Sequence, residues 1–312
     1  MSFNFLLFAA LSIVLQVTSA RSAEPPVTSI AFAPDGNSLV ACSQAGLQVY
    51  SWPELVQQKR IEVSAVNLHD IAFSPSGDRL AVAGGSPAED GSVEIFSWPE
   101  GKSLHLFRNH TDSVTTVAWR NETSLATASL DYTVNIWDIK SEKPIHTLQG
   151  HSRGVSSICF LPDQRTLVTT GIDQSLRVWN SDSAELIHGL SIHTQHVHHL
   201  ATRPAADGLP MVASASGDRT VRLWQPTIGR MVRFAKLKSI PLNVAWLPDG
   251  SKVVACCTNG HVYVIDPDTV EVLHDIPAVD GWAYSLAVHP TDGTLAVGGS
   301  NGQLRRITME SE

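Results

Sequence analysis

Four histidines fall within seven residues of the sequence, at His193, His196, His198 and His199. Neutral imidazole is the commonest metal ligand among side chains and titrates near physiological pH, so such a cluster could hold a metal or move protons. We expect this run to form a strand, on which His198 and His199 point to opposite sides. At most two of the four rings can then converge, and no carboxylate or cysteine nearby completes a site. The sequence therefore predicts neither a metal site nor a cofactor.

Other motifs for catalysis or cofactor binding are missing from the sequence. It contains no P-loop and no glycine-rich dinucleotide loop. The residues at 298–302 match the string G-x-S-x-G, but in the repeat they fit a turn between strands and not a nucleophile elbow. The four cysteines show no CxxC or Cys/His spacing, which excludes haem attachment and structural zinc. Each lies in an apolar run, so we expect buried, reduced thiols at Cys42, Cys159, Cys256 and Cys257.

A second polar pattern recurs three times in the middle of the chain. It combines a histidine, a serine or threonine, an aspartate and a tryptophan, with the aspartate always six residues before the tryptophan. The three sets are His110, Thr127, Asp131 and Trp137; His151, Thr169, Asp173 and Trp179; and His193, Ser214, Asp218 and Trp224. A buried indole N–H and a buried imidazole both need hydrogen-bond partners, and a satisfied network fixes local geometry. We therefore interpret these twelve residues as structural.

The elements that carry these residues repeat along the whole chain. A turn signal built on Pro, Asp and Gly, with Asn in the proline slot once, recurs at positions 34, 75, 121, 162, 204, 248 and 290. The spacing of 41 to 46 residues is typical of a four-stranded propeller blade. Between the turns, apolar and polar residues alternate along the sequence, as in 155–160, and no helical period appears.

The repeat and the three polar sets resemble the WD40-repeat family over residues 24 to 310. The resemblance implies an all-β, seven-bladed β-propeller of four-stranded antiparallel blades, in which Asp holds His, His reaches Ser or Thr, and that hydroxyl reaches the Trp indole. It also implies a non-catalytic scaffold that binds one or more partner proteins. Four blades depart from the pattern and should be held by apolar packing, because their tryptophan slots contain Tyr50, Phe96, Ile265 and Ile307.

The N-terminal segment admits two interpretations. An apolar run over 5–15 followed by small residues up to Ala20 predicts a secretory signal peptide over 1–20, with a single propeller domain over 21–312 and no stable membrane insertion after cleavage. The mature protein is then periplasmic or secreted, and its last blade has three strands. Alternatively, residues 12–17 form the strand that closes the ring, as WD40 rings usually close, and the protein is cytoplasmic.

The partner surface is predicted at the mouth of the central channel. The net charge of −8 argues against nucleic acid as a ligand. The residues just before each innermost strand should line the rim: Pro26, Asn67, Ser113, Gly154, His196, Ile240 and Trp282. Ile240, Trp282 and Pro26 belong to consecutive blades and predict an apolar arc with an aromatic anchor, unless Trp282 folds over its own blade. The alternative function is a propeller enzyme or a redox or metal accessory that uses His198, Tyr284 and His69 in the channel.

Overall fold

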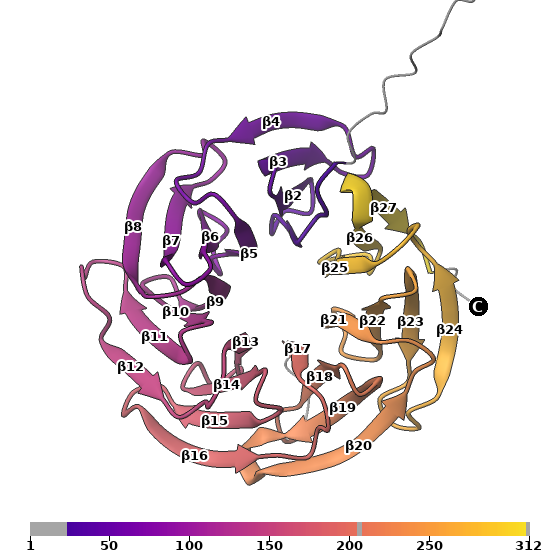
Figure 1. Ribbon diagram of the computed structural model, residues 1–312. Helices are drawn as coiled ribbons and strands as arrows, with labels where there is room; N and C mark the ends of the chain where they lie inside the picture. The colour runs from indigo at the N-terminus through magenta and orange to yellow at the C-terminus, as the bar shows by residue number, and fades with distance from the viewer. Residues whose placement is uncertain (1–23, 205–207, 310–312) are drawn as a thin grey trace, which may run out of the picture.

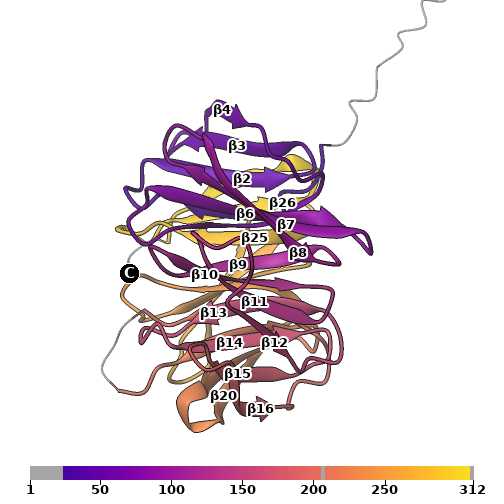
Figure 2. The same cartoon turned by 90° about the vertical axis from the view of Figure 1, so that its left-hand side faces the viewer.

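The computed structural model describes residues 24–204 and 208–309 of the chain. They form seven antiparallel sheets arranged as blades around a central channel (Figure 1). Figure 2 shows the ring edge-on, with the strands running between its two faces. The predicted signal peptide over 1–20 and the alternative closing strand over 12–17 lie outside the described residues. No helix in the described part of the chain is long and apolar enough to cross a membrane.

Each blade is a meander in which the first strand lines the channel and the last lies at the periphery (Figure 1). The first two blades contain β1 (Ser29–Phe32), β2 (Ser38–Ser43), β3 (Gly46–Ser51), β4 (Gln57–Ile61), β5 (Leu68–Phe73), β6 (Arg79–Ser86), β7 (Asp90–Ser97) and β8 (Ser103–His110). The next two contain β9 (Val114–Asn121), β10 (Ser124–Ser129), β11 (Thr133–Asp138), β12 (His146–Gln149), β13 (Val155–Phe160), β14 (Thr166–Gly171), β15 (Leu176–Asn180) and β16 (Glu185–Leu190). The last three contain β17 (Val197–Thr202), β18 (Val212–Ser216), β19 (Thr220–Gln225), β20 (Arg230–Lys236), β21 (Pro241–Trp246), β22 (Val253–Cys257), β23 (His261–Ile265), β24 (Val272–Pro277), β25 (Ala283–Val288), β26 (Leu295–Gly299) and β27 (Leu304–Ile307). The described part of the chain also contains two short 3₁₀ turns, Pro226–Ile228 and Ser300–Gly302.

The core is divided among the seams between neighbouring blades. Strands such as β10 and β18 are buried along their whole length because both of their faces are covered by adjacent blades. Such strands consist of small and β-branched residues, which suit a pleated surface covered on both sides. At the seam between the fifth and sixth blades, for example, Ala213 and Ala215 pack in one cluster with Val244 and Trp246. Each blade is therefore stabilised by its two neighbours.

Six of the seven inner strands carry an irregularity in register close to their first residue. In β17, for example, Val197 pairs with Ser216 and His199 pairs with Ala215, so His198 has no opposite residue. A bulge of this kind breaks the alternation of side chains along a strand. Two consecutive residues can then face the same side, and in this ring that side is the channel.

The last sheet contains three strands in the described part of the chain, as the sequence predicts. The ring nevertheless closes between this sheet and β1. The Val27 amide donates to the Gly299 carbonyl at 3.1 Å, and Ser285 Oγ donates to the Val27 carbonyl at 3.0 Å. Val27 and Ala296 pack in the same buried cluster. The seven-bladed all-β propeller predicted from the sequence is confirmed.

The blades without the complete polar set are packed in different ways. Phe96 and Ile265 are buried in the tryptophan slot, whereas Tyr50 and Ile307 are only half-buried. In the first blade, Trp52 lies edge-on to Phe32, with ring centroids 4.7 Å apart. Trp52 also stacks over a histidine of the last blade, so an aromatic contact reinforces the seam where the ring closes.

Candidate functional site

The polar set of the third blade forms an unbroken chain of hydrogen bonds. The Trp137 indole donates to Thr127 Oγ1 at 2.9 Å, and this hydroxyl lies 2.8 Å from His110 Nε2. His110 Nδ1 lies 2.8 Å from Asp131 Oδ2. A neutral imidazole satisfies this geometry with its proton on Nδ1, because the tryptophan donates to the hydroxyl and the hydroxyl donates to Nε2.

The fourth and fifth blades repeat these contacts. His151 joins Asp173 and Thr169 at 3.0 and 2.7 Å, and His193 joins Asp218 and Ser214 at 2.8 Å each. The Trp179 and Trp224 indoles donate to the same hydroxyls at 2.9 and 2.8 Å. Each histidine lies at or just after the outer strand of one blade, while its partners belong to the next blade. The sets therefore hold the connections between blades.

The aspartates of these sets have lowered pKa values. Burial by itself raises the pKa of Asp131, but hydrogen bonds from His110 and Thr133 outweigh it and lower the pKa to about 2. Hydrogen bonds also lower the pKa values of Asp173 and Asp218, although burial by itself would raise them. An aspartate with a depressed pKa stabilises the fold above its unfolded pKa of about 3.9, and this contribution is lost as the pH falls toward the folded value.

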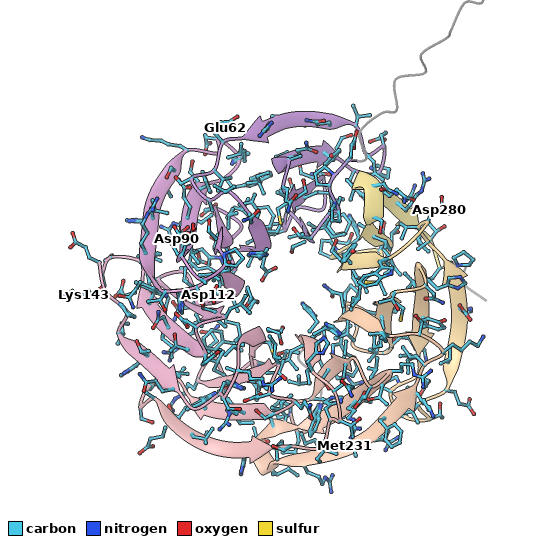
Figure 3. All side chains as sticks on the ribbon, viewed as in Figure 1. Glu62, Asp90, Asp112, Lys143, Met231 and Asp280 are labelled. Carbon is cyan, nitrogen blue, oxygen red and sulfur yellow. The ribbon has the colours of Figure 1, made fainter. Side chains whose placement is uncertain are left out.

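A cavity of about 130 Å³ lies in the central channel. The inner strands of all seven blades, or the residue next to them, contribute to its wall. Its lining consists of Thr28, Ser29, His69, Asp70, Thr115, Thr116, Ser156, His198, His199, Leu242, Asn243 and Tyr284. Figure 3 shows side chains directed into the channel from around the ring.

The expectation that His198 and His199 point to opposite sides is wrong. Both line the cavity, because the bulge between Val197 and His199 brings consecutive residues to the channel side. His196 also lies close, with its ring centroid 4.0 Å from that of His198. His193 instead takes part in the hydrogen-bonded set of the fifth blade. Within the described ranges, no group of three or more His, Cys, Asp or Glu side chains could hold a metal ion.

The channel histidines are poor bases. Burial, reinforced by the neighbouring His196 and His199, lowers the pKa of His198 to about 4. Burial also lowers the pKa of His199 to about 4, although its hydrogen bond to the Val244 carbonyl opposes this shift. Burial lowers the pKa of His69 as well. These imidazoles are therefore neutral in neutral solution.

Asp70 is a channel residue that the sequence analysis missed, and it joins three blades. Its carboxylate accepts from Ser29 Oγ of the first blade at 2.9 Å and from Thr116 Oγ1 of the third at 2.9 Å. The Val117 amide adds a bond of 3.0 Å. Burial raises the pKa of Asp70, and these hydrogen bonds oppose the rise. The sequence feature that could have predicted this role is a pair of polar residues at the start of most inner strands, such as Thr115-Thr116.

The predicted rim residues differ in exposure. Trp282 is 49% exposed, and its ring packs on that of Tyr284, a residue of the cavity wall, with centroids 5.7 Å apart. His196 is also exposed, and Asn67 is tied down by a bond from its amide to the Gly85 carbonyl at 3.1 Å. Ile240 and Pro26 are half-buried, and Ser113 and Gly154 are buried. The exposed part of the apolar arc is therefore Trp282.

Further apolar side chains are exposed on the same face. We call this side the loop face, since it carries the blade-to-blade linkers, such as 191–196 and 278–282, and the turns between second and third strands. Val66 and Ile192 lie in linkers, and Tyr132 and Ile172 lie in or beside such turns. The sequence does not predict these four residues as surface anchors, because they lie outside the apolar alternation of the strands.

A family profile described as "WD domain, G-beta repeat" matches residues 15–51, 101–138, 142–180 and 184–225. Three of these four segments contain one complete polar set each. Each of these three begins near an outer strand and ends at or just after the third strand of the next blade. The repeat in the sequence therefore spans two structural blades.

Curated proteins with related sequences cover part of the chain. The chain is 30% identical over 180 residues to THO complex subunit 3 of Arabidopsis thaliana, which covers 55% of this chain and 43% of the relative. It is 27% identical over 206 residues to nuclear distribution protein PAC1 of Gibberella zeae, covering 63% and 33% respectively. An uncharacterized WD repeat-containing protein of Synechocystis sp. is 30% identical over 142 residues, covering 44% and 39%. The matched regions span less than half the length of these relatives.

Removal of the shared hydroxyl in one set should destabilise the protein. Thr127→Val keeps the shape of the side chain but leaves the Trp137 indole without its partner, and leaves His110 Nε2 with the Asn135 amide at 3.2 Å. We expect the free energy of unfolding to fall by about 2 kcal/mol, because a buried indole N–H loses its hydrogen bond. Chemical denaturation measures this, with the exposed Thr194→Val as control. Equal stability of the two variants would contradict the structural role.

The channel histidines should titrate only in acid. Nuclear magnetic resonance of the imidazole carbons should show His198 and His199 taking up protons near pH 4, against about 6.5 for an unperturbed histidine. Because the unfolded chain binds these protons first, both residues should lower stability as the pH falls from about 6.5 toward 4. A midpoint near 6.5 for both rings would show that water reaches them freely.

Proposed function

Because the chain belongs to the WD40-repeat family, we propose that it is a non-catalytic scaffold that binds partner proteins on the loop face around its channel. The observation that carries this proposal is Trp282, a half-exposed indole at the channel mouth. Its amide donates to Ser300 Oγ at 3.1 Å, and its carbonyl accepts from the Ser300 amide at 3.0 Å. The backbone beneath the ring is thus fixed on both sides. A rigid exposed aromatic is typical of an interface anchor.

The surroundings of Trp282 support the same proposal. Val66 is 75% exposed and Tyr132 is 52% exposed, and both lie on the loop face with Ile172 and Ile192. Tyr132 adopts a left-handed backbone conformation with φ of 74°, which is uncommon for an aromatic residue. Exposed apolar side chains held on a rigid frame favour protein binding. One of the related proteins is, by its name, a subunit of a complex.

A second candidate is a propeller enzyme or redox accessory that uses the channel. One observation favours it: His69, His198 and Tyr284, which come from three different blades, line the same cavity. The polar groups of the blade sets do not contribute, because each is bound within its set. The cavity lining, as far as the structure describes it, includes neither cysteine nor lysine. We therefore favour the scaffold.

We also propose that the protein is exported after cleavage behind Ala20. The apolar run over 5–15 and the small residues after it support this. In the alternative, residues 12–17 stay in the protein and complete the last sheet, and the protein is cytoplasmic.

Replacement of the anchor should weaken partner capture without unfolding the protein. We expect Trp282→Ala to reduce the affinity for a captured partner by about tenfold or more, as for an interface hot spot. Phe234→Ala is the matched control, because this aromatic is 47% exposed but lies on the outer strand β20. Affinity capture and thermal melting measure both effects. A large loss of melting temperature in Trp282→Ala with unchanged capture would make Trp282 a core residue.

The N-terminal sequence of the protein recovered from its native cells tests the export proposal. We expect the first residue to be Arg21, in protein recovered from outside the cytoplasm. Retention of Met1 or Ser2 would instead leave residues 12–17 available to close the ring.

A further inference from the structure

The channel cavity is rich in hydrogen-bond acceptors, because the hydroxyl groups of its wall donate their protons to neighbouring blades. The hydroxyls of Thr28, Thr115 and Ser156 point into the next seam. Thr28 Oγ1 donates to the Leu68 carbonyl at 2.9 Å and Thr115 Oγ1 to the Val155 carbonyl at 2.7 Å. Ser156 Oγ donates to the main chain of the following blade in the same way. Each hydroxyl has one proton, so only its lone pairs remain for a ligand.

Other side chains of the cavity wall also donate their protons within the protein. The Ser29 and Thr116 hydroxyls donate to Asp70, at 2.9 Å each. His199 Nδ1 lies 3.1 Å from the Val244 carbonyl oxygen, which can only accept. His199 therefore carries its proton on Nδ1, and its Nε2 keeps a lone pair.

Two buried polar atoms of the cavity wall lack a partner among the described residues, namely Asn243 Oδ1 and His69 Nε2. The first is an acceptor, and the second becomes one when the proton is on Nδ1. Buried polar atoms in folded proteins are almost always paired, so each exception calls for an explanation. A donor supplied from outside the chain would satisfy both atoms.

The charge of the wall selects the kind of donor. The lining includes one carboxylate, Asp70, and neither lysine nor arginine. At the mouth, Trp282 and Tyr284 present aromatic rings, whose faces attract cations. The cavity is smaller than the sites that bind drug-sized molecules, yet it can admit a group of a few heavy atoms.

We propose that this cavity binds the guanidinium or ammonium group of a partner's arginine or lysine side chain, which enters past Trp282. The inference rests on the proposed function, because the loop face must meet a protein for such a side chain to arrive. Neutral imidazoles, hydroxyl lone pairs and Asn243 Oδ1 would accept its N–H groups, and Asp70 would balance its charge.

The test uses the full-length protein and a blocked Gly-Arg-Gly tripeptide, followed by nuclear magnetic resonance of the His69 ring and the Trp282 indole at neutral pH. We expect saturable shifts of both signals, and none with the tripeptide that carries citrulline, the neutral analogue of arginine. Asn243→Leu should weaken binding by about tenfold, because a hydrogen bond to a charged group is lost. The wall should accept this leucine, because Leu242 already lines the cavity in the adjacent position. His69→Phe is a second variant of the wall and should also weaken binding.

Gln58→Leu on the exposed face of β4 is the matched control and should bind like the unaltered protein. Equal shifts with the citrulline peptide, or unchanged affinity in both wall variants, would overturn the inference. Free methylguanidinium that binds as tightly as the tripeptide and leaves Trp282 unmoved would overturn the role of a partner side chain. If the tripeptide fails while Trp282→Ala still weakens partner capture, only this inference falls and the scaffold function stands.

Discussion

Side-chain hydrogen bonds that cross from one inner strand to the next are the contacts on which the centre of the ring depends. Apolar seams hold neighbouring blades together, whereas the innermost strands surround a cavity whose wall is mostly polar. Polar side chains join the strands there, and one residue, Asp70, links the first, second and third blades. At the seam where the ring closes, Ser285 performs the same task for Val27. The polarity of the channel is therefore first a consequence of building the ring.

This constraint has a consequence for binding. A hydroxyl that donates its only proton to a neighbouring blade offers lone pairs to whatever enters the channel. The bulges near the start of the inner strands increase the effect, because they bring two residues of a blade to the wall instead of one. The three His-Ser/Thr-Asp-Trp sets act farther out, where they fix the linkers that form the loop face. Together these contacts make the loop face rigid around a polar, acceptor-rich centre.

Much of the fold could be predicted from the sequence, because the repeat has a fixed length and a strict turn signal. The three polar sets could be recognised because each aspartate lies in the turn between the second and third strands and its tryptophan lies on the third strand. This arrangement fixes the spacing of the two residues in the sequence. The channel was harder to predict. Alternation along a strand placed His198 and His199 on opposite sides, and only the backbone register reveals the bulge that brings them together. The exposure of Trp282 and the partial burial of Ile240 also depend on how linkers fold over the blades, which a repeat pattern does not encode.

The most direct test of a binding site on the loop face is hydrogen–deuterium exchange of the protein, alone and with a captured partner. Amide exchange reports local opening, and a bound partner slows it where the two surfaces meet. We expect slower exchange in the linkers over 191–196 and 278–282 and in the turn that contains Tyr132. Exchange at the opposite face, for instance in the turn over 247–251, should stay unchanged. Protection confined to that opposite face or to the outer strands would contradict a binding site around the channel mouth.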